Sequence, residues 1–238
     1  MDYDKMQRVR DGAFIVLLIG LAGFLYQEAP RHPVVALEEK PPLVVAQPVP
    51  GLQIGRGQNL ALPVANFADT RWRSDSVTLV PSAATAPDQT TAAFRLVESA
   101  RNDRHRIETA IGGITPGGTY TLSLYVKPAE RGQLQFEMRD GKVGKYGIAG
   151  FDLFRKAVVT ESGDVSDSGI QELPDGWFRC WAAMPYATDM VVFNFALITA
   201  SGVVYWGSSG AGLFIWGVQL EPGDHPGGYA VAVAPAKP

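Results

Sequence analysis

Residues 119–127 read TYTLSLYVK, and apolar and polar side chains alternate along this stretch. Successive side chains of a β-strand point to opposite faces, so the even-numbered residues share one face, while Tyr125 and the other odd-numbered residues share the other. The side chains that we expect to face the core are those of Tyr120, Leu122, Leu124 and Val126. A sustained period of two predicts a strand with one buried face.

The same alternation, or a short apolar run, recurs along the chain. The segments concerned are 76–80, 92–98, 104–111, 133–139, 148–154, 177–184, 190–199 and 213–221. Turn-forming residues separate them, as in Pro116-Gly117-Gly118, Asp140-Gly141 and Pro174-Asp175-Gly176. We find no convincing amphipathic helix after residue 30. Many short strands with such turns predict an all-β protein, an antiparallel β-sandwich of the jelly-roll type, over residues 58–224.

The N-terminal part has a different pattern. An apolar run, AFIVLLIGLAGFLY, fills residues 13–26 and follows a polar stretch that contains Lys5, Arg8 and Arg10. As a helix the run is roughly 21 Å long, short of the ~30 Å hydrocarbon core, but a helix from Val9 to Ala29 would span it. We therefore expect residues 1–29 to be a cytoplasmic N-terminus and a single transmembrane anchor helix.

A cleaved signal peptide is the alternative, but no site with the expected small residues follows the apolar run closely. The basic residues ahead of the run predict a cytoplasmic N-terminus and a β-domain on the outer side of a bacterial inner membrane. Six prolines predict an extended linker over residues 30–57. Residues 225–238 are rich in Pro, Gly and Ala and are expected to form a loose tail.

Several short motifs carry a resemblance to a known family. They are Asn59-Leu60, APDQTTA at 86–92, YTLSLYVK at 120–127, GWFRC at 176–180 and IWGVQLEPG at 215–223. In order and spacing they resemble the carbohydrate-binding-module-like jelly rolls of phage spike and tail-fibre proteins and of bacterial surface proteins, over residues 59–229. The resemblance implies a jelly-roll fold and recognition of surface glycans. Gln89 departs from the pattern, because the family usually has Gly there.

Composition and motifs exclude several other functions. The net charge of −3 shows no basic excess, so no nucleic-acid partner is expected. His32, His105 and His225 have no metal-ligand spacing to one another or to the lone Cys180, which we expect to be a small buried residue. Neither a G-x-S-x-G nor an H-E-x-x-H motif occurs. We therefore predict a protein that is not an enzyme.

The carboxylates allow two further interpretations. A glycoside hydrolase needs a pair of carboxylates, for which Glu108, Glu137 and Asp152 are candidates, but charges on the solvent faces of strands are common. Jelly rolls of the resembled kind often carry a structural calcium ion, which oxygen ligands would hold. The candidate ligands for calcium are Asp88, Glu221 and Asp224.

Glycan binding requires aromatic faces beside polar groups. The faces opposite the expected core supply the candidate ligand-binding residues Tyr125, Gln135, Glu137, Arg179, Trp181 and Asn194. Trp177 and Trp181 share one strand face with Arg179 between them. The plainer interpretation of a tryptophan is burial: Trp72, Trp206 and Trp216 could all lie in the core, and Trp177 could close one end of the sandwich.

These observations leave more than one function open. The first is a membrane-tethered module that binds a glycan without catalysis. The second is an accessory or scaffold subunit of a membrane protein complex, in which the helix packs against other membrane helices and the β-domain docks on the periplasmic face. Gly20 and Gly23 would permit close helix packing. A part of a phage fibre or spike is a third interpretation.

Overall fold

A computed structural model describes residues 52, 58–62, 65–141 and 144–230. The predicted membrane helix (1–29) lies outside these residues, as do the predicted linker (30–57) apart from Leu52 and the last part of the predicted tail (231–238). The strands of the described part are β1 (Arg73–Asp75), β2 (Val77–Ala84), β3 (Ala93–Glu98), β4 (Asn102–Gly112), β5 (Thr119–Pro128), β6 (Gln133–Asp140), β7 (Tyr146–Asp152), β8 (Ala157–Gly163), β9 (Asp167–Glu172), β10 (Phe178–Pro185), β11 (Met190–Leu197), β12 (Val204–Trp206) and β13 (Gly212–Pro222).

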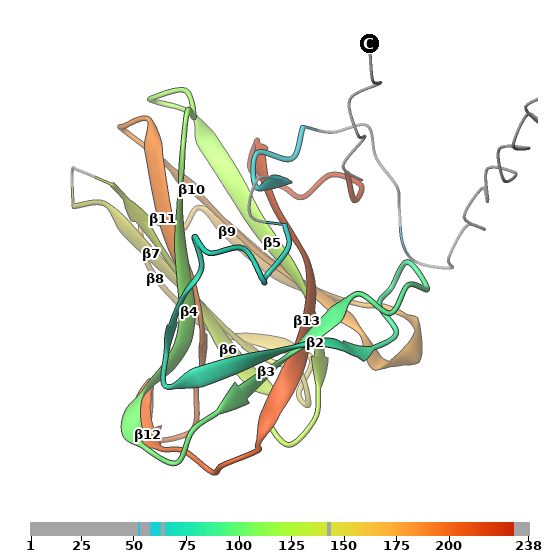
Figure 1. Cartoon of the computed structure of the whole chain (residues 1–238). Coiled ribbons are helices and arrows are strands. Elements are labelled where there is room, and N and C mark those ends of the chain that lie inside the picture. The colour runs from blue at the N-terminus through green and yellow to red at the C-terminus, as the bar shows by residue number, and fades with distance from the viewer. Residues whose placement is uncertain (1–51, 53–57, 63–64, 142–143, 231–238) are drawn as a thin grey trace, which may run out of the picture. The chain divides into compact units, whose positions relative to one another are not determined.

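The strands form two antiparallel sheets (Figure 1). The seven-stranded sheet has the order β1-β4-β11-β6-β7-β8, and β12 pairs with β4 beside it. The six-stranded sheet has the order β2-β3-β13-β5-β10-β9. The chain passes from β4 in one sheet to β5 in the other and back to β6, so neighbouring strands come from distant parts of the sequence. This confirms the predicted jelly-roll sandwich.

Apolar side chains from the inner faces of both sheets make up the main core. Leu122, Leu124 and Val126 of β5 have no exposed surface, as the alternation in residues 119–127 predicts. From the seven-stranded sheet, Phe136 packs edge-on against Phe195, with 4.8 Å between the ring centroids. Burying such side chains contributes about 1.5–3 kcal/mol each, so this interior is the chief source of stability.

A second, smaller cluster lies on the outer face of the six-stranded sheet. Its buried members are Leu52, Ala86, Ala93, Tyr125, Leu173, Trp177 and Trp216. The side chain of Tyr229 packs over them, because residues 225–230 lie against this face. The central strand β5 is therefore buried on both sides, and Tyr125 is only 1% exposed.

The structure contains every strand predicted from the sequence and some that were not predicted, namely β1, β8, β9 and β12. A short 3-10 turn, η2 (Pro174–Gly176), precedes β10. Among the described residues, no helix is long and apolar enough to cross a membrane.

The tryptophans and the cysteine have clear positions. Trp72, Trp177 and Trp216 are buried, but Trp206 is 74% exposed, so the interpretation of Trp206 as a core residue is wrong. Trp206 is the last residue of β12, a three-residue strand that pairs only with β4 and leaves its side chain in solvent. Cys180 is fully buried, and this burial raises the pKa of its thiol well above the ordinary value. It fills space in the core, as expected.

Two motifs of the resemblance have a structural role. The amide of Asn59 donates to the carbonyl of Val218 (3.1 Å) and accepts from the backbone N–H groups of Ala61 (2.9 Å) and Leu220 (3.1 Å). This ties the start of the domain to β13. Gln89 has a φ of 65°, in the left-handed region that favours glycine.

Candidate functional site

The structure divides the predicted ligand-binding residues between the two sheets. Tyr125 on β5 and Arg179 and Trp181 on β10 lie on the outer side of the six-stranded sheet. Gln135, Glu137 and Asn194 lie on the outer side of the seven-stranded sheet, on β6 and β11. Because the core separates these faces, the two groups cannot contact the same small ligand.

The indole of Trp181 lies flat on the neighbouring strand β9. A Cβ atom placed on Gly169 would come within 2.1 Å of the ring carbon Cζ2 of Trp181 and within 2.4 Å of Cη2, so the ring covers the glycine backbone. The indole N–H donates to Oδ2 of Asp167, 3.1 Å away. One ring face is thus held against β9, and the partly exposed ring is fixed in orientation.

A pocket of about 260 Å³, here called the Trp181 pocket, opens beside this ring. Its lining residues are Tyr125, Gln171, Leu173, Arg179, Trp181, His225, Pro226 and Gly227. Strands β9 and β10 supply one side of the pocket, and residues 225–227 supply the other. The ring is therefore next to both polar side chains and a backbone segment.

Arg179 organises the floor of the pocket. Its guanidinium donates to Oγ of Ser123 (3.0 Å from Nη2), to Glu221 (3.3 Å) and to the carbonyl of Gly227. It also lies over the ring of Tyr125, 5.3 Å from the centroid. Arg179 is 5% exposed, and its guanidinium already donates to groups of the protein. Its main role is therefore to hold residues 225–227 in place, and it has little capacity left to donate to a ligand.

Tyr125 does not present an open ring face. Its ring meets Trp216 and Tyr229 edge-on, with centroid distances of 5.2 Å and 5.7 Å. Burial raises the pKa of the Tyr125 hydroxyl to about 12. Of the two aromatic residues among the predicted ligand-binding residues, only Trp181 has a face available for stacking.

Sequence reasoning missed several residues around this pocket. Asp167, Gly169 and Gln171 are on β9, whose sequence DSGIQE has no clear alternation. His225, Pro226 and Gly227 belong to the segment that we expected to be a loose tail. Residues 225–230 instead make ordered contacts: Gly227 N–H donates to Glu221 (3.1 Å), and Gln219 bonds to both Gly228 (3.2 Å) and Ala230 (2.9 Å).

The candidate calcium ligands do not converge. Asp88 accepts hydrogen bonds from Thr90 within its own loop, and Glu221 is bound to Arg179 and Gly227. Asp224 is exposed, and its Oδ1 lies 3.4 Å from Nδ1 of His225. In the part of the chain that the structure describes, no three His, Cys, Asp or Glu side chains are grouped so that they could hold a metal ion.

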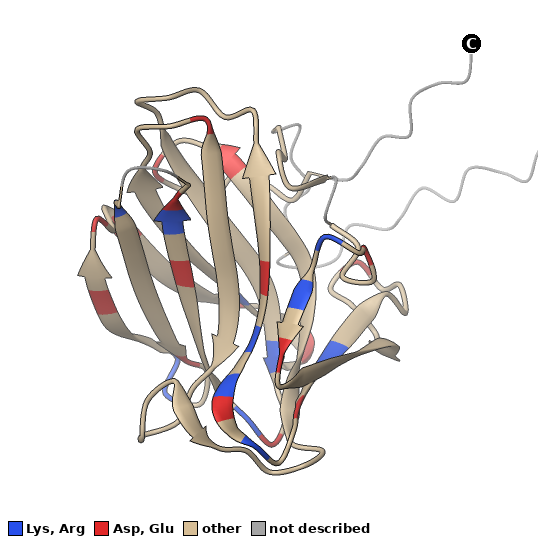
Figure 2. Ribbon diagram, turned by 60° about the vertical axis from the view of Figure 1, so that its left-hand side comes forward, with Lys and Arg blue, Asp and Glu red and all other residues tan. Residues whose placement is uncertain are grey.

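The other predicted group lies among charged side chains on the seven-stranded sheet. Figure 2 shows basic and acidic bands on these strands. The amide nitrogen of Asn194 donates to Oε2 of Glu137 at 3.0 Å. Gln135 is partly exposed and lies beside Gly150 and Ala196 in register. This face is polar and has small residues on its floor.

Comparison with known proteins gives structural likenesses only. No protein-family model matches the chain, and none of the curated proteins does. The chain is similar to the enzymatically active domain of tailspike protein 4 from bacteriophage CBA120, with 14% identity and a TM-score of 0.41, over 72% of this chain and 21% of that one.

It is also similar to carbohydrate-binding modules. One is TmCBM61, whose structure was solved in complex with β-1,4-galactotriose. The two sequences are 14% identical, the TM-score is 0.43, and the match covers 70% of this chain and 99% of that one. Another is TmCBM27, described for specific mannan recognition: 12% identity, TM-score 0.36, over 71% and 96% of the two chains.

Proposed function

We propose that the sandwich is a non-catalytic glycan-binding module that holds a sugar in the Trp181 pocket. The observation that carries this proposal is the flat, fixed position of the Trp181 ring over Gly169. Sugar rings present C–H groups that pack on an aromatic face, and a ring already held in place loses little conformational entropy when a sugar binds. The hydrogen bond to Asp167 fixes the ring further.

Polar groups surround the ring in a way that suits hydroxyl recognition. Gln171 is exposed on β9, and the His225 side chain is 69% exposed on the opposite side of the pocket. The volume of 260 Å³ is below the roughly 300–1,000 Å³ of typical small-molecule sites. A pocket of this size favours one or two sugar rings and weak binding, with a Kd on the order of 0.1–1 mM.

The lining residues also support the absence of catalysis. None of the residues that line the pocket is a carboxylate. The candidate hydrolase carboxylates Glu108 and Glu137 lie on the other sheet and are bound by arginines. Asp152 accepts hydrogen bonds from Gln133 and from backbone N–H groups that follow it. Beside the ring, Asp167 accepts the indole N–H of Trp181, and Glu221 is bound to Arg179 and Gly227, so both carboxylates already have structural partners in the places where glycoside hydrolysis would need an acid and a base.

The test is a glycan screen, followed by calorimetry on the wild type and on the variants Trp181→Ala and Trp206→Ala. Trp181→Ala should weaken binding at least about tenfold, which corresponds to ~1.4 kcal/mol, with the melting temperature little changed. Trp206→Ala is the matched control, because it removes an exposed tryptophan far from the pocket lining. A broad screen without any bound glycan, or equal losses in both variants, would contradict the proposal.

We further propose that the module is tethered to the outer side of a bacterial inner membrane. The support is the apolar run at 13–26 and the basic residues Lys5, Arg8 and Arg10 before it. Protease added to spheroplasts should degrade the β-domain, and carbonate washing should leave the protein in the membrane fraction. Release by carbonate, or full protection from protease, would reject the tether.

A second function has one observation in its favour. Trp206 (74% exposed) and Val204 (52% exposed) form an apolar spot on β12 that the glycan pocket does not explain. Large exposed aromatic residues are common at protein interfaces. If the chain is an accessory subunit of a membrane complex, extraction in mild detergent should yield a stoichiometric set of partners, and Trp206→Ala should reduce it. A lone monomer would count against this alternative.

A further inference from the structure

The outer side of the seven-stranded sheet holds an unusual arrangement around Asn194. This residue is on β11, where its register partners are Glu108 on β4 and Glu137 on β6. Although its side chain is on the outer side of the sheet, Asn194 has no exposed surface. Other side chains must therefore lie across it.

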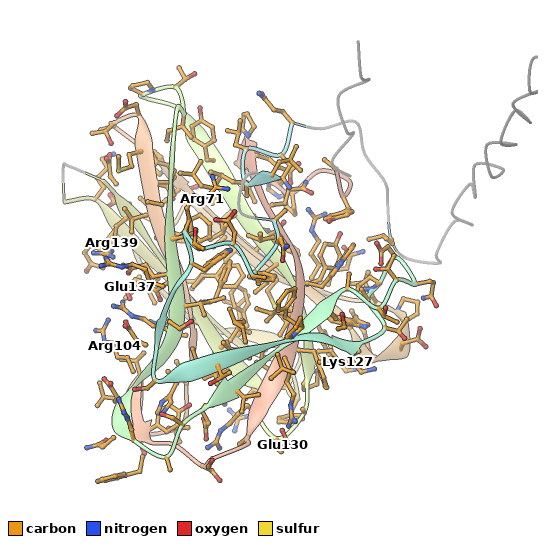
Figure 3. The ribbon with its side chains drawn as sticks, viewed as in Figure 1. Arg71, Arg104, Lys127, Glu130, Glu137 and Arg139 are labelled. Carbon is orange, nitrogen blue, oxygen red and sulfur yellow. The ribbon has the colours of Figure 1, made fainter. Side chains whose placement is uncertain are left out.

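Two ion pairs provide this cover. Arg139 of β6 reaches Glu108 of β4, with 2.6 Å between Nη2 and Oε2. Arg104 of β4 reaches Glu137 of β6 at 3.5 Å. Because β11 lies between β4 and β6, both pairs cross over β11. Figure 3 shows Arg104, Glu137 and Arg139 together on this side of the molecule, away from Lys127.

The cover leaves two polar atoms without partners. The Asn194 nitrogen donates to Glu137, but Oδ1 of Asn194 is buried and accepts no hydrogen bond from the residues that the structure describes. Nε of Arg139 is likewise buried and donates none. Buried polar atoms are nearly always paired, so an unpaired acceptor and an unpaired donor on neighbouring strands of one face indicate a place where a ligand can supply both partners.

A hollow of about 460 Å³ adjoins these groups. Its lining includes Glu137, Arg139 and Val192, together with Asp140, Lys145 and Tyr146. Tyr146 is 48% exposed and offers an aromatic face, while Lys145 is partly exposed. The hollow thus combines two cations and an aromatic ring with the carboxylates of Glu137 and Asp140. The covered amide of Asn194 is not part of this lining and adjoins it through its hydrogen bond to Glu137.

We propose that this face is a second binding site and that its ligand is a hydroxylated carboxylate, such as a uronic acid residue of an acidic glycan. A carboxylate accepts from Arg139 and Lys145, and a sugar hydroxyl donates to Oδ1 of Asn194. Sulfate and fully ionised phosphate cannot supply that donor. A neutral sugar supplies it but offers no anionic group to Arg139 and Lys145.

Arg139 can exchange its partner Glu108 for the ligand carboxylate, because other groups then keep Glu108 and Glu137 paired. When Arg139 turns to the ligand, Glu108 keeps Arg106, whose Nη1 is 3.4 Å from Oε2 of Glu108. Glu137 likewise keeps its hydrogen bond from Asn194. Neither carboxylate is therefore left without a partner, and the side chain of Arg139, which is 43% exposed, can move without disturbing the core.

The experiment is calorimetric titration with oligomers of galacturonate, glucuronate, mannuronate and guluronate, and with neutral oligomers of the same length. At least one uronate oligomer should bind, its affinity should fall with added salt, and its neutral counterpart should bind at least tenfold more weakly. Inorganic sulfate at equal ionic strength should not compete. Failure of all four uronates to bind, or equal affinity for the neutral oligomer, would overturn the proposal.

Variants locate the site. Arg139→Gln should weaken uronate binding at least tenfold, and Lys145→Gln at least threefold. Lys127→Gln removes the same charge from β5 of the other sheet and should change affinity less than twofold (Figure 3). If Arg139→Gln and Lys127→Gln reduced the affinity for the uronate oligomer to a similar extent, the effect would come from the overall charge of the protein, and the site would be rejected. Trp181→Ala should leave uronate binding unchanged, so this site and the Trp181 pocket fail or succeed separately.

Discussion

The hydroxyl of Tyr205 donates a 2.6 Å hydrogen bond to Oε2 of Glu98, a carboxylate whose side chain has no exposed surface. The same carboxylate accepts from the guanidinium of Arg131 and, at 2.5 Å, from the backbone N–H of Ser208. A buried charge is tolerated when it is paired and hydrogen-bonded in this way. The cluster holds β12 and the loop after it against β3.

Tyr205→Phe removes the hydroxyl that donates to Glu98 and keeps the aromatic ring. Because the bond goes to a charged group, we expect a loss of about 1.5–3 kcal/mol in the free energy of unfolding, measured by urea titration. Tyr146→Phe is the control, since Tyr146 is 48% exposed, and it should change stability by less than about 0.5 kcal/mol. Equal effects in the two variants would show that the Tyr205 hydroxyl does not stabilise Glu98.

Glu98 should also make stability depend on pH. Burial by itself would raise the pKa of Glu98, but hydrogen bonds from Arg131, Tyr205 and Ser208 outweigh it and hold this pKa below the ordinary value of 4.5. A lowered pKa contributes stability above the unfolded-state pKa, and this contribution is lost as pH falls through the folded-state value.

The corresponding comparison uses Glu98→Gln. The wild type should be more stable than this variant at neutral pH, and the two urea midpoints should approach each other below about pH 4, where the unfolded carboxylate is protonated. A difference that stays constant down to pH 2 would mean that the charge of Glu98 is not the stabilising feature.

The buried pair of Arg179 and Glu221 predicts strong coupling. Their side chains are 7% and 6% exposed. Among the described residues, Arg179→Met leaves the Glu221 charge with the Gly227 N–H as its remaining partner. We expect a loss of about 3–5 kcal/mol. Adding Glu221→Gln should recover at least half of it, because the uncompensated charge is removed. A double variant whose loss equals the sum of the single losses would contradict this coupling.

Gly169→Ala tests the position of the Trp181 ring. The added methyl group would meet Cζ2 of Trp181 at 2.1 Å, so the ring must move. We expect a shift in tryptophan fluorescence and glycan binding weakened at least fivefold. Gly112→Ala is the matched control, because its added carbon meets nothing closer than 3.9 Å. Unchanged fluorescence and affinity in Gly169→Ala would show that Trp181 is not held on β9.

Gln89→Gly should stabilise the domain. At a φ of 65°, Gln89 incurs about 1–2 kcal/mol of backbone strain, and the greater freedom of glycine in the unfolded chain cancels about half of the gain. The net increase should be ~0.5–1 kcal/mol by chemical denaturation. The same change at Gln135, inside strand β6, should destabilise instead. A loss of stability at both positions would refute the role of the left-handed backbone.

Alternation in the sequence predicted the central strands because each has a buried face. Three of the strands that were not predicted lack one: β1 is exposed throughout, and β8 and β9 are exposed or only partly buried. The fourth, β12, buries Tyr205, but three residues are too few to show a period. An edge strand is stabilised by backbone pairing with its neighbour, and such pairing leaves no periodic trace in the side chains. Local patterns therefore predicted the central strands and the edge strand β2, and missed the edge strands β1, β8 and β9.

The candidate site was predicted only in part. Alternation placed Tyr125, Arg179 and Trp181 on outer faces, but it cannot tell which strands share a sheet, so Gln135, Glu137 and Asn194 could not be separated from them. The position of residues 225–230 was also hidden, because Pro and Gly gave no pattern. Their order comes from distant partners, Gln219, Glu221 and Arg179.

The side chain of Asn59 determines how the domain would bear a mechanical load. It is bound to the backbone of β13, and β13 lies between β3 and β5 inside its sheet. Tension that enters through the chain before Asn59 acts first on this central strand. Unfolding under force would then require shearing β13 from both neighbours at once, which resists pulling better than peeling an edge strand one bond at a time.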